Sequence, residues 1–497
     1  MPTPEYYSHA LLTCAEMRRA EALSCARGPL SFYDLMQNAG AAVADAVMKK
    51  WKPCRVLVMS GPGNNGGDGY VAAEALRCAG WPVIVGAMTS NSQTPDAAKA
   101  AQAWQGETHS LIPALFDNVD LVIDALFGTG LQRPLTGEVA ALVKNLNARK
   151  IPVIAADFPS GVDGDTGRIL GVAVEAQLTV TFFRKKRGHV LLPGATLCGE
   201  IIVAETGMHQ DVLDEVKPLT FENHTDLWLS QFPFPQPESH KYSRGHALIY
   251  GGPVMTGAAR LAARAAQRMG AGLVTLAAPE NAMPLYAVAL ESVIVRQTDR
   301  LDQWRALLND PKKSAVLIGP GMGLGEPLKA FVLSTLESRK PCVLDADALT
   351  IFADAPDELF SVLHQDCVLT PHEGEFSRLF GERVKSNGDK IERAQKAAKI
   401  AGCIVLLKGA DTVIASPDGF AVVNGSAPPW LATAGSGDVL AGMITGLLTQ
   451  GLPSFEAAVA GAWLHSRIAA LFGPGLIAED IVAGIPALLK TLSSKGN

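Results

Sequence analysis

The stretch ATAGSGD, residues 432–438, followed by VLAGMITGLLTQG, is the part of the chain around which the rest is organised. The apolar residues after Asp438 recur at helical spacing, and Gly451 is suited to end that helix. The glycine-rich turn therefore precedes a helix N-terminus, where free backbone N–H groups and the helix dipole favour an anion. An aspartate placed there can take a proton from a hydroxyl that attacks a phosphate. We favour a phosphate-transfer site with Asp438 as its base over a tight turn that ends in an acidic residue.

The length and composition predict a multidomain globular protein. The chain has 497 residues, of which 48% are hydrophobic and 19% charged, enough for two or more cores. The net charge of −6 and the short basic clusters argue against binding to nucleic acid or to an anionic membrane. No apolar run reaches the length of a bilayer span, the N-terminus lacks an apolar signal region, and the eight cysteines form no CxxC pair. We expect a cytoplasmic protein with free thiols.

Predicted strands alternate with predicted helices through both halves of the chain, which indicates α/β domains with mostly parallel sheets. Ligands of such sheets bind beyond the carboxyl ends of the strands, so loops that follow strands are expected to converge. Residues 217–245 interrupt the pattern with three closely spaced prolines. We therefore predict a first domain over residues 1–216, a linker and the start of the second domain over 217–245, and a second domain over 246–497.

Three motifs after predicted strands indicate a ligand site in the first domain. The loop GPGNNGGDG at 61–69 lacks the GxGxxG spacing of a dinucleotide fingerprint, but it adds side-chain oxygens and amides. These groups suit a polar ligand or a cation held by oxygens, whereas the alternative is a purely structural turn. Asp124 ends DLVID, and Asp157 and Ser160 lie in DFPSG; each alone could be a cap, but together they indicate one site. We interpret the basic run 184–187 as a solvated face rather than a phosphate contact.

The second domain carries further candidates at strand ends. The loop 408–412 suits nucleotide phosphates better than a surface hairpin. His372 lies in a loop at the same edge and is predicted to contact a ligand. Asp345 and Asp347 could steer Mg²⁺ held mainly by phosphates, or could cap the strand end. His465 lies in an apolar helix, and we interpret it as a packed or surface histidine.

Taken together, the motifs resemble a known pair of domains. The first domain is similar to the NAD(P)HX epimerase domain in GNNGGDGYVAAEAL, DLVIDALFGTGLQRPLTG and ADFPSGVDGDTG. The second resembles the NAD(P)HX dehydratase domain, which has a ribokinase-like fold, in HKYSRGHALIYGG, MTGAARLAARAAQRMGAGLVTLA, IGPGMG, LDADAL, LTPHEGEFSRL, LLKGADTVI and ATAGSGD. Their order and fusion resemble the bacterial bifunctional nicotinamide nucleotide repair family, over residues 10–215 and 222–495.

The resemblance implies a repair enzyme with a Rossmann-like N-terminal domain and a ribokinase-like C-terminal domain. Reduced nicotinamide cofactors can become hydrated on the ring, and in this family an isomerase domain interconverts the R and S hydrates. A hydro-lyase domain then dehydrates the S form while ADP becomes AMP and phosphate. The resemblance further implies K⁺ in the epimerase, held by Asn65, Asp124 and Ser160, and Mg²⁺ with ADP in the dehydratase. We also expect a homo-oligomer that takes NADHX, NADPHX and ADP as its small-molecule substrates.

The resemblance assigns binding residues motif by motif. The epimerase substrate contacts are Asn64, Asn65, Gly66, Gly67, Asp68, Gly128, Thr129, Gly130, Leu131, Gln132, Arg133, Pro134 and Asp157. The dehydratase substrate contacts are Ala258, Gly321, His372 and Asp438. The ADP or AMP contacts are Lys408, Gly409, Ala410, Asp411, Thr412 and Gly437. The stretch GGPVMTGAAR, which contains Ala258, is one residue shorter than in some relatives.

Asp438 and Asp157 are the candidates for catalysis. Asp438 would deprotonate the ring hydroxyl, the resulting alkoxide would attack the terminal phosphoryl group of ADP, and phosphate would then leave the ring. Asp157 would act as acid or base in the epimerase. Two rival interpretations stay open: a small-molecule kinase of the ribokinase-like type, and an N-terminal half that binds a ligand without catalysis.

Overall fold

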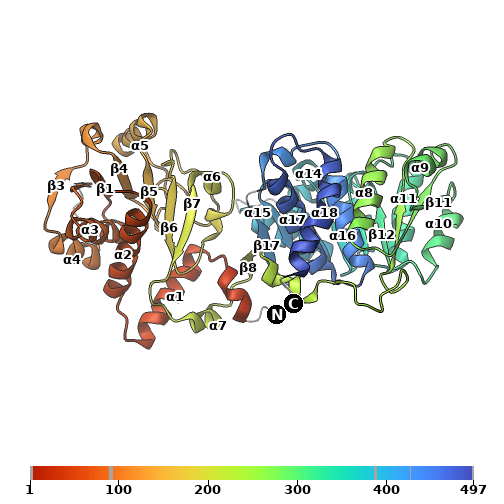
Figure 1. The fold of residues 1–497 in the computed structure, drawn as a ribbon, viewed down its shortest axis with the longest axis horizontal. Coiled ribbons are helices and arrows are strands. Elements are labelled where there is room, and N and C mark those ends of the chain that lie inside the picture. Colours follow the sequence, from red (N-terminus) through yellow and green to blue (C-terminus); the bar gives the residue numbers. More distant parts are fainter. Residues whose placement is uncertain (1–3, 89–92, 385–388, 426, 495–497) are drawn as a thin grey trace. The chain divides into compact units, whose positions relative to one another are not determined.

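The computed structural model describes residues 4–88, 93–384, 389–425 and 427–494, and the chain separates into two units, residues 1–221 and 222–497 (Figure 1). The division falls inside the proline-containing segment 217–245. That segment holds strand β8 (Thr220–Glu222) and two short 3₁₀ helices, Thr225–Leu227 and Leu229–Gln231. Within the described ranges, no helix combines the length and apolar character needed to cross a membrane.

Seven parallel strands form the sheet of the first unit, in the order β3-β2-β1-β4-β5-β6-β7. The strands are β1 (Val56–Ser60), β2 (Val83–Ala87), β3 (Glu107–Ser110), β4 (Leu121–Ala125), β5 (Val153–Ala156), β6 (Leu178–Phe182) and β7 (Glu200–Ala204). The first six follow the strand order of dinucleotide-binding folds, which confirms the expected Rossmann-like parallel sheet.

Helices cover both faces of this sheet. They are α1 (Cys14–Arg27), α2 (Phe32–Lys50), α3 (Asn64–Cys78), α4 (Pro95–Ala103), α5 (Gly137–Arg149), α6 (Gly194–Leu197) and α7 (Leu213–Val216). Successive residues of a strand point to opposite faces. Val56 and Val58 therefore pack with α2 and α3, while Leu57 and Met59 pack with α5. The continuous apolar runs of the central strands reflect this burial on both sides.

Two local features of the first unit differ from the expectation. The pattern places residues 61–69 in a loop, but α3 begins at Asn64 and takes most of the motif into its first turns. Glycine is required there, because a Cβ on Gly66 would lie 1.9 Å from the carbonyl oxygen of Gly61. Strand β3 is not predicted at all, because its residues ETHS are exposed and carry no apolar alternation.

Ten strands form the sheet of the second unit, in the order β11-β10-β9-β12-β13-β14-β15-β16-β17-β8. After β8 they are β9 (His246–Tyr250), β10 (Leu273–Ala278), β11 (Ile294–Gln297), β12 (Ala315–Ile318), β13 (Cys342–Leu344), β14 (Cys367–Leu369), β15 (Ile404–Leu407), β16 (Thr412–Ala415) and β17 (Ala421–Asn424). The strands from β11 to β15 pair in parallel, and the hairpin of β16 and β17 continues the sheet in antiparallel fashion. This arrangement confirms the predicted mostly parallel α/β domain.

The helices of the second unit begin with α8 (Thr256–Arg268), α9 (Met283–Ala289), α10 (Leu301–Leu308), α11 (Glu326–Glu337), α12 (Asp347–Thr350) and α13 (Pro356–Phe360). They continue with α14 (Glu373–Phe380), α15 (Lys390–Ala401), α16 (Ser436–Thr449), α17 (Ser454–Phe472) and α18 (Ala478–Ser493).

Helix α16, which follows the glycine-rich turn, lies in the core of the second unit, between α8 and α17 (Figure 1). Every residue from Val439 to Thr449 is buried. Small residues permit this, because Cβ atoms on Gly442 and Gly446 would lie 2.3 and 2.7 Å from the carbonyl oxygens of Ala262 and Ala266 on α8. The close backbone approach of the two helices fixes where the turn at 432–438 is presented.

We predict that Gly442→Ala destabilises the second unit by about 1–3 kcal/mol, because the added methyl group meets the backbone of α8. Gly257→Ala, on exposed helix α8 surface with nothing within 4 Å of the new Cβ, is the matched control and should gain up to about 1 kcal/mol of helix propensity. Urea unfolding of the full chain measures both variants. An equal response of the two would contradict the close approach of α16 and α8.

Candidate active sites

The first candidate site lies where β4 and β5 end, beside the start of α3. Asp124, at the end of β4, is fully buried and accepts hydrogen bonds from the N–H and the hydroxyl of Ser160, each at 2.7 Å. The Ser160 hydroxyl oxygen also accepts a hydrogen bond from the N–H of Phe127 at 2.9 Å. Burial raises the pKa of Asp124 to about 6, against the effect of its hydrogen bonds. The structure thus joins the predicted loops after β4 and β5.

Asn65 reaches the same site from α3. Both polar atoms of its side chain are buried, without a hydrogen-bond partner among the described residues. A Cβ on Gly128 would lie 3.1 Å from Oδ1 of Asn65 and 3.2 Å from Oδ2 of Asp157, so the two side chains border one small space. A buried amide of this kind suits a cation or a polar ligand. All three motif loops of the first unit therefore meet, as the sequence predicts.

Asp157 is held by Lys186, which the sequence reasoning missed. The Nζ atom of Lys186 donates hydrogen bonds to Asp157 Oδ1 at 2.7 Å and to Thr181 Oγ1 at 2.8 Å, and Lys186 is only 1% exposed. Burial acts to raise the pKa of Asp157, but the charge and hydrogen bond of Lys186 outweigh it, and the pKa is lowered. The carboxylate is therefore ionised at neutral pH.

The interpretation of residues 184–187 as a solvated face is wrong. Lys186 and Arg184 are both buried, because the chain turns inward after β6 instead of continuing along the surface. Arg184 donates a hydrogen bond to the carbonyl oxygen of Tyr7 at 2.6 Å. One sequence feature did indicate that this run lies near the site: it directly follows a buried strand, at the edge of the sheet where the motif loops lie.

The remaining predicted contacts of the first unit lie at different depths. Asp68 is buried, and this burial, followed by the charges of Asp157 and Glu21, raises its pKa well above the usual range. Burial likewise raises the pKa of Glu21, on α1, to about 7. Asn64 is exposed and accepts a hydrogen bond from the Thr94 hydroxyl at 2.6 Å. Four predicted contacts in the loop after β4 are exposed, namely Gly130, Gln132, Arg133 and Pro134.

The second candidate site is centred on the glycine-rich turn. Gly435 caps α16 with a φ of 86°, a left-handed conformation that glycine adopts without strain. Asp438 follows in the first turn, where backbone N–H groups lack intrahelical partners. Burial, followed by the charges of Asp345 and Asp347, raises the pKa of Asp438 to about 6, and the charge of Lys408 opposes this effect. A carboxylate with a pKa near neutrality can act as a general base.

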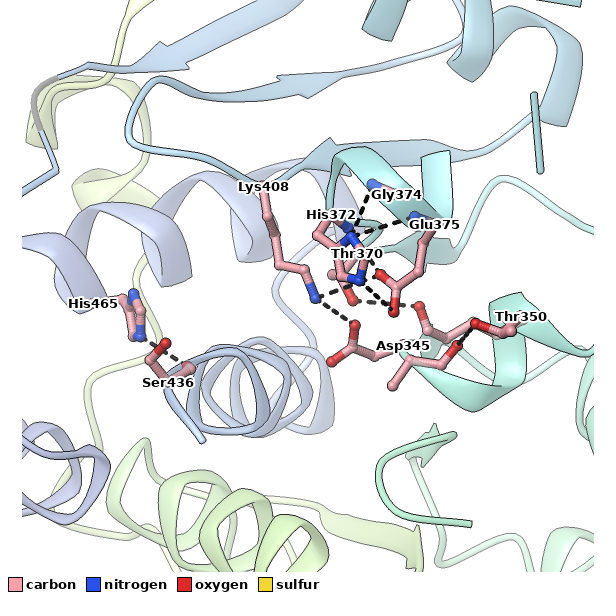
Figure 2. Close-up of polar contacts among 11 residues, drawn as sticks. Asp345, Thr350, Thr370, His372, Gly374, Glu375, Lys408, Ser436 and His465 are labelled. Atoms are coloured by element: carbon pink, nitrogen blue, oxygen red, sulfur yellow. Dashed lines mark hydrogen bonds and ion pairs between the residues drawn. The ribbon is translucent and has the colours of Figure 1, made fainter. Parts of the chain in front are cut away.

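Lys408 connects the turn to two other strand ends. Its Nζ atom donates a hydrogen bond to Asp345 Oδ1 at 2.7 Å and lies 4.0 Å from Glu375 Oε2. Figure 2 shows the ammonium group pointing toward these carboxylates. Burial acts to lower the pKa of Lys408, but the charges of Asp345 and Glu375 outweigh it and the pKa is raised. The lysine therefore remains charged, and Glu375 is a member of the site that sequence reasoning missed.

His372 is the N-cap of α14. Its Nδ1 atom accepts hydrogen bonds from the N–H groups of Gly374 and Glu375, and the backbone N–H of His372 donates to Glu375 Oε2 at 2.8 Å (Figure 2). The His372 to Glu375 spacing is that of a capping box, a signal present in the sequence. The Nε2 atom of the half-exposed ring lies 3.5 Å from Glu375 Oε1, so both ring nitrogens face polar groups at the start of α14.

His465 is buried, as expected of a packed histidine, yet it lies against the turn. Its Nε2 atom is 2.9 Å from the carbonyl oxygen of Ser436 (Figure 2), and burial lowers its pKa to about 4. The ring is therefore neutral, and the Nε2–H donates to the carbonyl. This contact supports the turn from the side of α17.

A pocket of about 260 Å³ lies beside this turn. Five of the six predicted nucleotide contacts line it, namely Lys408, Gly409, Ala410, Thr412 and Gly437. The sixth, Asp411, accepts a hydrogen bond from Lys390 Nζ at 2.8 Å. The wall includes the apolar side chains of Leu440 and Ala462, and a mainly apolar pocket with a few polar groups is typical of small-molecule sites.

The loops after β9 and β12 bring two further predicted contacts, Ala258 and Gly321, close together. Gly321 has a φ of 68°, and a Cβ there would lie 2.4 Å from the carbonyl oxygen of Met255. A Cβ on Gly252 would lie 1.9 Å from the carbonyl oxygen of Gly321. Ala258 is buried in the first turn of α8, directly after this contact. Asp347 accepts a hydrogen bond from the N–H of Gly323 at 2.7 Å, so it also fixes this loop.

Two family descriptions match the chain. Residues 33–188 match "YjeF-related protein N-terminus", and residues 247–478 match "NAD(P)H-hydrate dehydratase". The bifunctional NAD(P)H-hydrate repair enzyme Nnr of Moorella thermoacetica is 36% identical, over 98% of this chain and 97% of its own length. The protein of the same name from Escherichia coli is 34% identical, over 98% of this chain and 95% of its own length.

A solved structure supports the fold of the second unit. A ribokinase-like superfamily protein from Enterococcus faecalis is similar over 55% of this chain and 96% of its own length, with a TM-score of 0.50 and 24% identity. This similarity confirms the expected ribokinase-like fold.

We predict that Lys408→Met lowers the melting temperature of the second unit more at pH 8 than at pH 5. Without the ammonium group, nothing opposes burial and the charges of Asp345 and Asp347, so the pKa of Asp438 rises further above its unfolded value. A raised carboxyl pKa means that stability is lost as the pH rises, because the folded state binds more protons. Lys396→Met, at an exposed lysine, is the control. An equal loss at both pH values would indicate lost packing instead of lost charge.

Proposed function

The chain belongs to the family of bifunctional NAD(P)H-hydrate repair enzymes, and on that premise we propose a division of labour between its units. The N-terminal unit interconverts the R and S hydrates of NADH and NADPH. The C-terminal unit dehydrates the S hydrate and converts ADP to AMP and phosphate. The observation that carries the second assignment is Asp438, a carboxylate of pKa about 6 beside a glycine-capped helix N-terminus and a charged lysine.

In the dehydratase site we place the nucleotide in the pocket beside α16. Five of the proposed contacts line that pocket, namely Lys408, Gly409, Ala410, Thr412 and Gly437, and the first turn of α16 offers N–H groups to the phosphates. Lys408 remains charged and can balance the negative charge of the phosphoryl group during transfer. The hydrate then lies on the side of Asp438, near the loops that carry Ala258, Gly321 and His372.

Asp438 takes the proton of the ring hydroxyl. The hydroxyl oxygen attacks the terminal phosphorus of ADP, the bond between that phosphorus and the bridging oxygen breaks, and AMP leaves. Phosphate is a better leaving group than hydroxide, so the lone pair of the ring nitrogen expels it from the ring. Loss of a proton from the neighbouring ring carbon restores the dihydronicotinamide. The rival kinase differs at this point, because it would release a stable phosphate ester.

Mg²⁺ bound with the nucleotide would neutralise phosphate charge and orient the terminal phosphoryl group. The fit rests on donor chemistry: Asp345 and Asp347 lie near enough to Asp438 to raise its pKa, and carboxylate oxygens are the ligands that Mg²⁺ prefers. Lys408 engages Oδ1 of Asp345, which leaves Oδ2 for such a contact.

In the epimerase site Asp157 exchanges a proton with the hydroxyl of the hydrated carbon. Whether the ring opens or water leaves transiently, a proton must be removed and returned at that position. The lowered pKa of Asp157 supports a role that starts from the ionised carboxylate. The residues at 64–68 and 128–134 surround the substrate.

K⁺ fits the donors of the same site. Asn65 Oδ1 is buried without a partner among the described residues, and the hydrogen-bonded side chains of Asp124 and Ser160 add oxygens at the same edge of the sheet. An alkali cation held by these three residues would supply a fixed positive charge next to the substrate. We also propose a cytoplasmic location, which suits a chain whose eight cysteines are all free.

We predict a crossed pattern for two variants of the full chain given a mixture of R and S hydrates with ADP. Asp438→Ala should abolish recovery of dihydronicotinamide absorbance while an R-enriched sample still equilibrates. Asp157→Asn should leave consumption of the S hydrate intact and slow R-to-S conversion by about 10²–10⁴-fold, the usual contribution of a general acid or base. Chromatography of both epimers, together with AMP and phosphate release, measures the two activities. Each variant is the folding control for the other.

The assignment of Asp438 would be wrong if Asp438→Ala kept near-normal dehydration, and that of Asp157 if Asp157→Asn kept normal epimerisation. A persistent phosphorylated product would instead support the kinase. An R/S ratio unchanged by the parent protein would support an N-terminal unit that only binds.

We predict that epimerisation needs K⁺ and that Asn65→Ala raises the K⁺ concentration needed for half-maximal rate by at least about 10-fold, because one of three oxygen donors is lost. The measurement is a K⁺ titration in tetramethylammonium buffer. Dehydration of S hydrate in the same solutions is the control. Epimerisation that proceeds at full rate without K⁺ would refute the cation site.

A further inference from the structure

Lys186 is a charged side chain kept away from water within the epimerase unit. Its Nζ atom donates hydrogen bonds to Asp157 Oδ1, to Thr181 Oγ1 and, at 3.4 Å, to the carbonyl oxygen of Phe182. Burial of an ammonium group is costly unless charge and hydrogen bonds compensate it. Three oxygens provide that compensation here, and only Asp157 is charged.

Two strained turns bring Lys186 and Asp157 together. At the end of β5 the N–H of Phe158 donates to the carbonyl of Ala156, a γ-turn with Asp157 at its centre and a φ of 62°. At the end of β6 the N–H of Arg184 donates to the carbonyl of Phe182, a second γ-turn with Phe183 at its centre and a φ of 61°. Such turns are rare and cost of order 1–3 kcal/mol each. Strain at the ends of two neighbouring strands, at Asp157 itself and at Phe183 on the turn that leads to Lys186, indicates a functional constraint.

His189 closes the arrangement through the main chain. Its Nδ1 atom accepts a hydrogen bond from the N–H of Lys186 at 2.9 Å, so Nε2 carries the proton and donates to the carbonyl of Asp157 at 2.9 Å. The ring stacks on Phe158 with centroids 3.7 Å apart. Lys186 and Asp157 are thus tied both by their side chains and by their backbones.

The pairing divides the two oxygens of Asp157. Oδ1 is occupied by Lys186 and Thr181, whereas Oδ2 lies toward the N–H of Thr129, at 3.4 Å, and toward the space between Gly128 and Asn65. We propose that Lys186 is a positioning residue of the epimerase, which keeps Asp157 charged through Oδ1 and presents Oδ2 to the substrate. This inference rests on the proposed role of Asp157.

Among the titratable groups around Asp157, Lys186 determines whether the carboxylate stays ionised. The titratable groups that face it are Lys186, His189, Asp68, Glu21, Cys14 and Cys198. Burial lowers the pKa of His189 to about 3, so that ring is neutral. Asp68, Glu21 and both thiols are acids that can only be neutral or negative, and burial raises their pKa values and so favours the neutral form. Once the ammonium group is removed, burial dominates and Asp157 takes up a proton at higher pH.

The experiment is the pH profile of R-to-S conversion from pH 5 to 9 in the full-length protein. We expect the parent rate to show no acidic limb from Asp157 in this range. Lys186→Met should introduce an acidic limb, shifted upward by about 1–3 pH units from the parent value, with kcat reduced more than KM. Lys186→Arg, which retains the charge, should restore part of the rate at pH 6. Thr181→Val removes a neutral donor from the same oxygen and should shift the limb less, in the same direction.

The exposed Lys144→Met is the matched control and should leave the profile unchanged. A loss by Lys186→Met that is uniform across pH, or no loss, would overturn the proposal. If Lys186→Met does not fold, Thr181→Val decides: a fall in rate between pH 8 and pH 5 that the parent protein does not show supports the proposal, and a profile identical to that of the parent protein overturns it. Asp157→Asn separates the two levels: loss of conversion at every pH upholds the role of Asp157 on which the inference rests, and normal conversion overturns both.

Discussion

A lysine ammonium group paired with an aspartate beyond a strand end, fully buried at Lys186 and partly buried at Lys408, is the interaction on which both sites of this protein depend. Lys186 meets Asp157 in the first unit and Lys408 meets Asp345 in the second, in each case with 2.7 Å between Nζ and Oδ1. Water is largely excluded from both pairs. An unpaired charge in either place would therefore cost free energy, which the partner of opposite charge offsets. Because the partners come from different strands, each pair also fixes the relative position of the loops that carry the chemistry.

The two pairs act differently on the carboxylates proposed for catalysis. In the first unit the lysine contacts Asp157 itself, and the pKa of that residue is lowered. In the second unit the lysine is hydrogen-bonded to Asp345. Its charge also acts on Asp438, but burial and neighbouring carboxylates outweigh it and raise the pKa of Asp438 to about 6. The same pair of residue types thus favours a permanently ionised carboxylate in one unit and a base that titrates near neutrality in the other.

Much of the fold and part of each site could be predicted from local sequence. Continuous apolar runs indicate central parallel strands, and glycine-rich loops after them mark the edge where Asp124, Asp157 and Asp438 lie. Strand β3 could not be predicted, since its polar residues form an exposed edge. Lys186 and Glu375 were missed because the burial of a charged side chain depends on partners remote in sequence: Lys186 meets Asp157 across 29 positions.

The sequence by itself determined the α/β class, the two-part organisation, the helix that begins after Gly435 and the resemblance to a cofactor-repair family, because these depend on periodicity, turn chemistry and ordered motifs. Only the tertiary structure decided which charges are buried and what they face. It placed Lys186 inside rather than on the surface, and it set the glycine-rich turn at the N-terminus of a buried helix through the contact of Gly442 with α8. The protonation state of a buried group depends on its distance from charged groups on other strands, and no local sequence pattern encodes that distance.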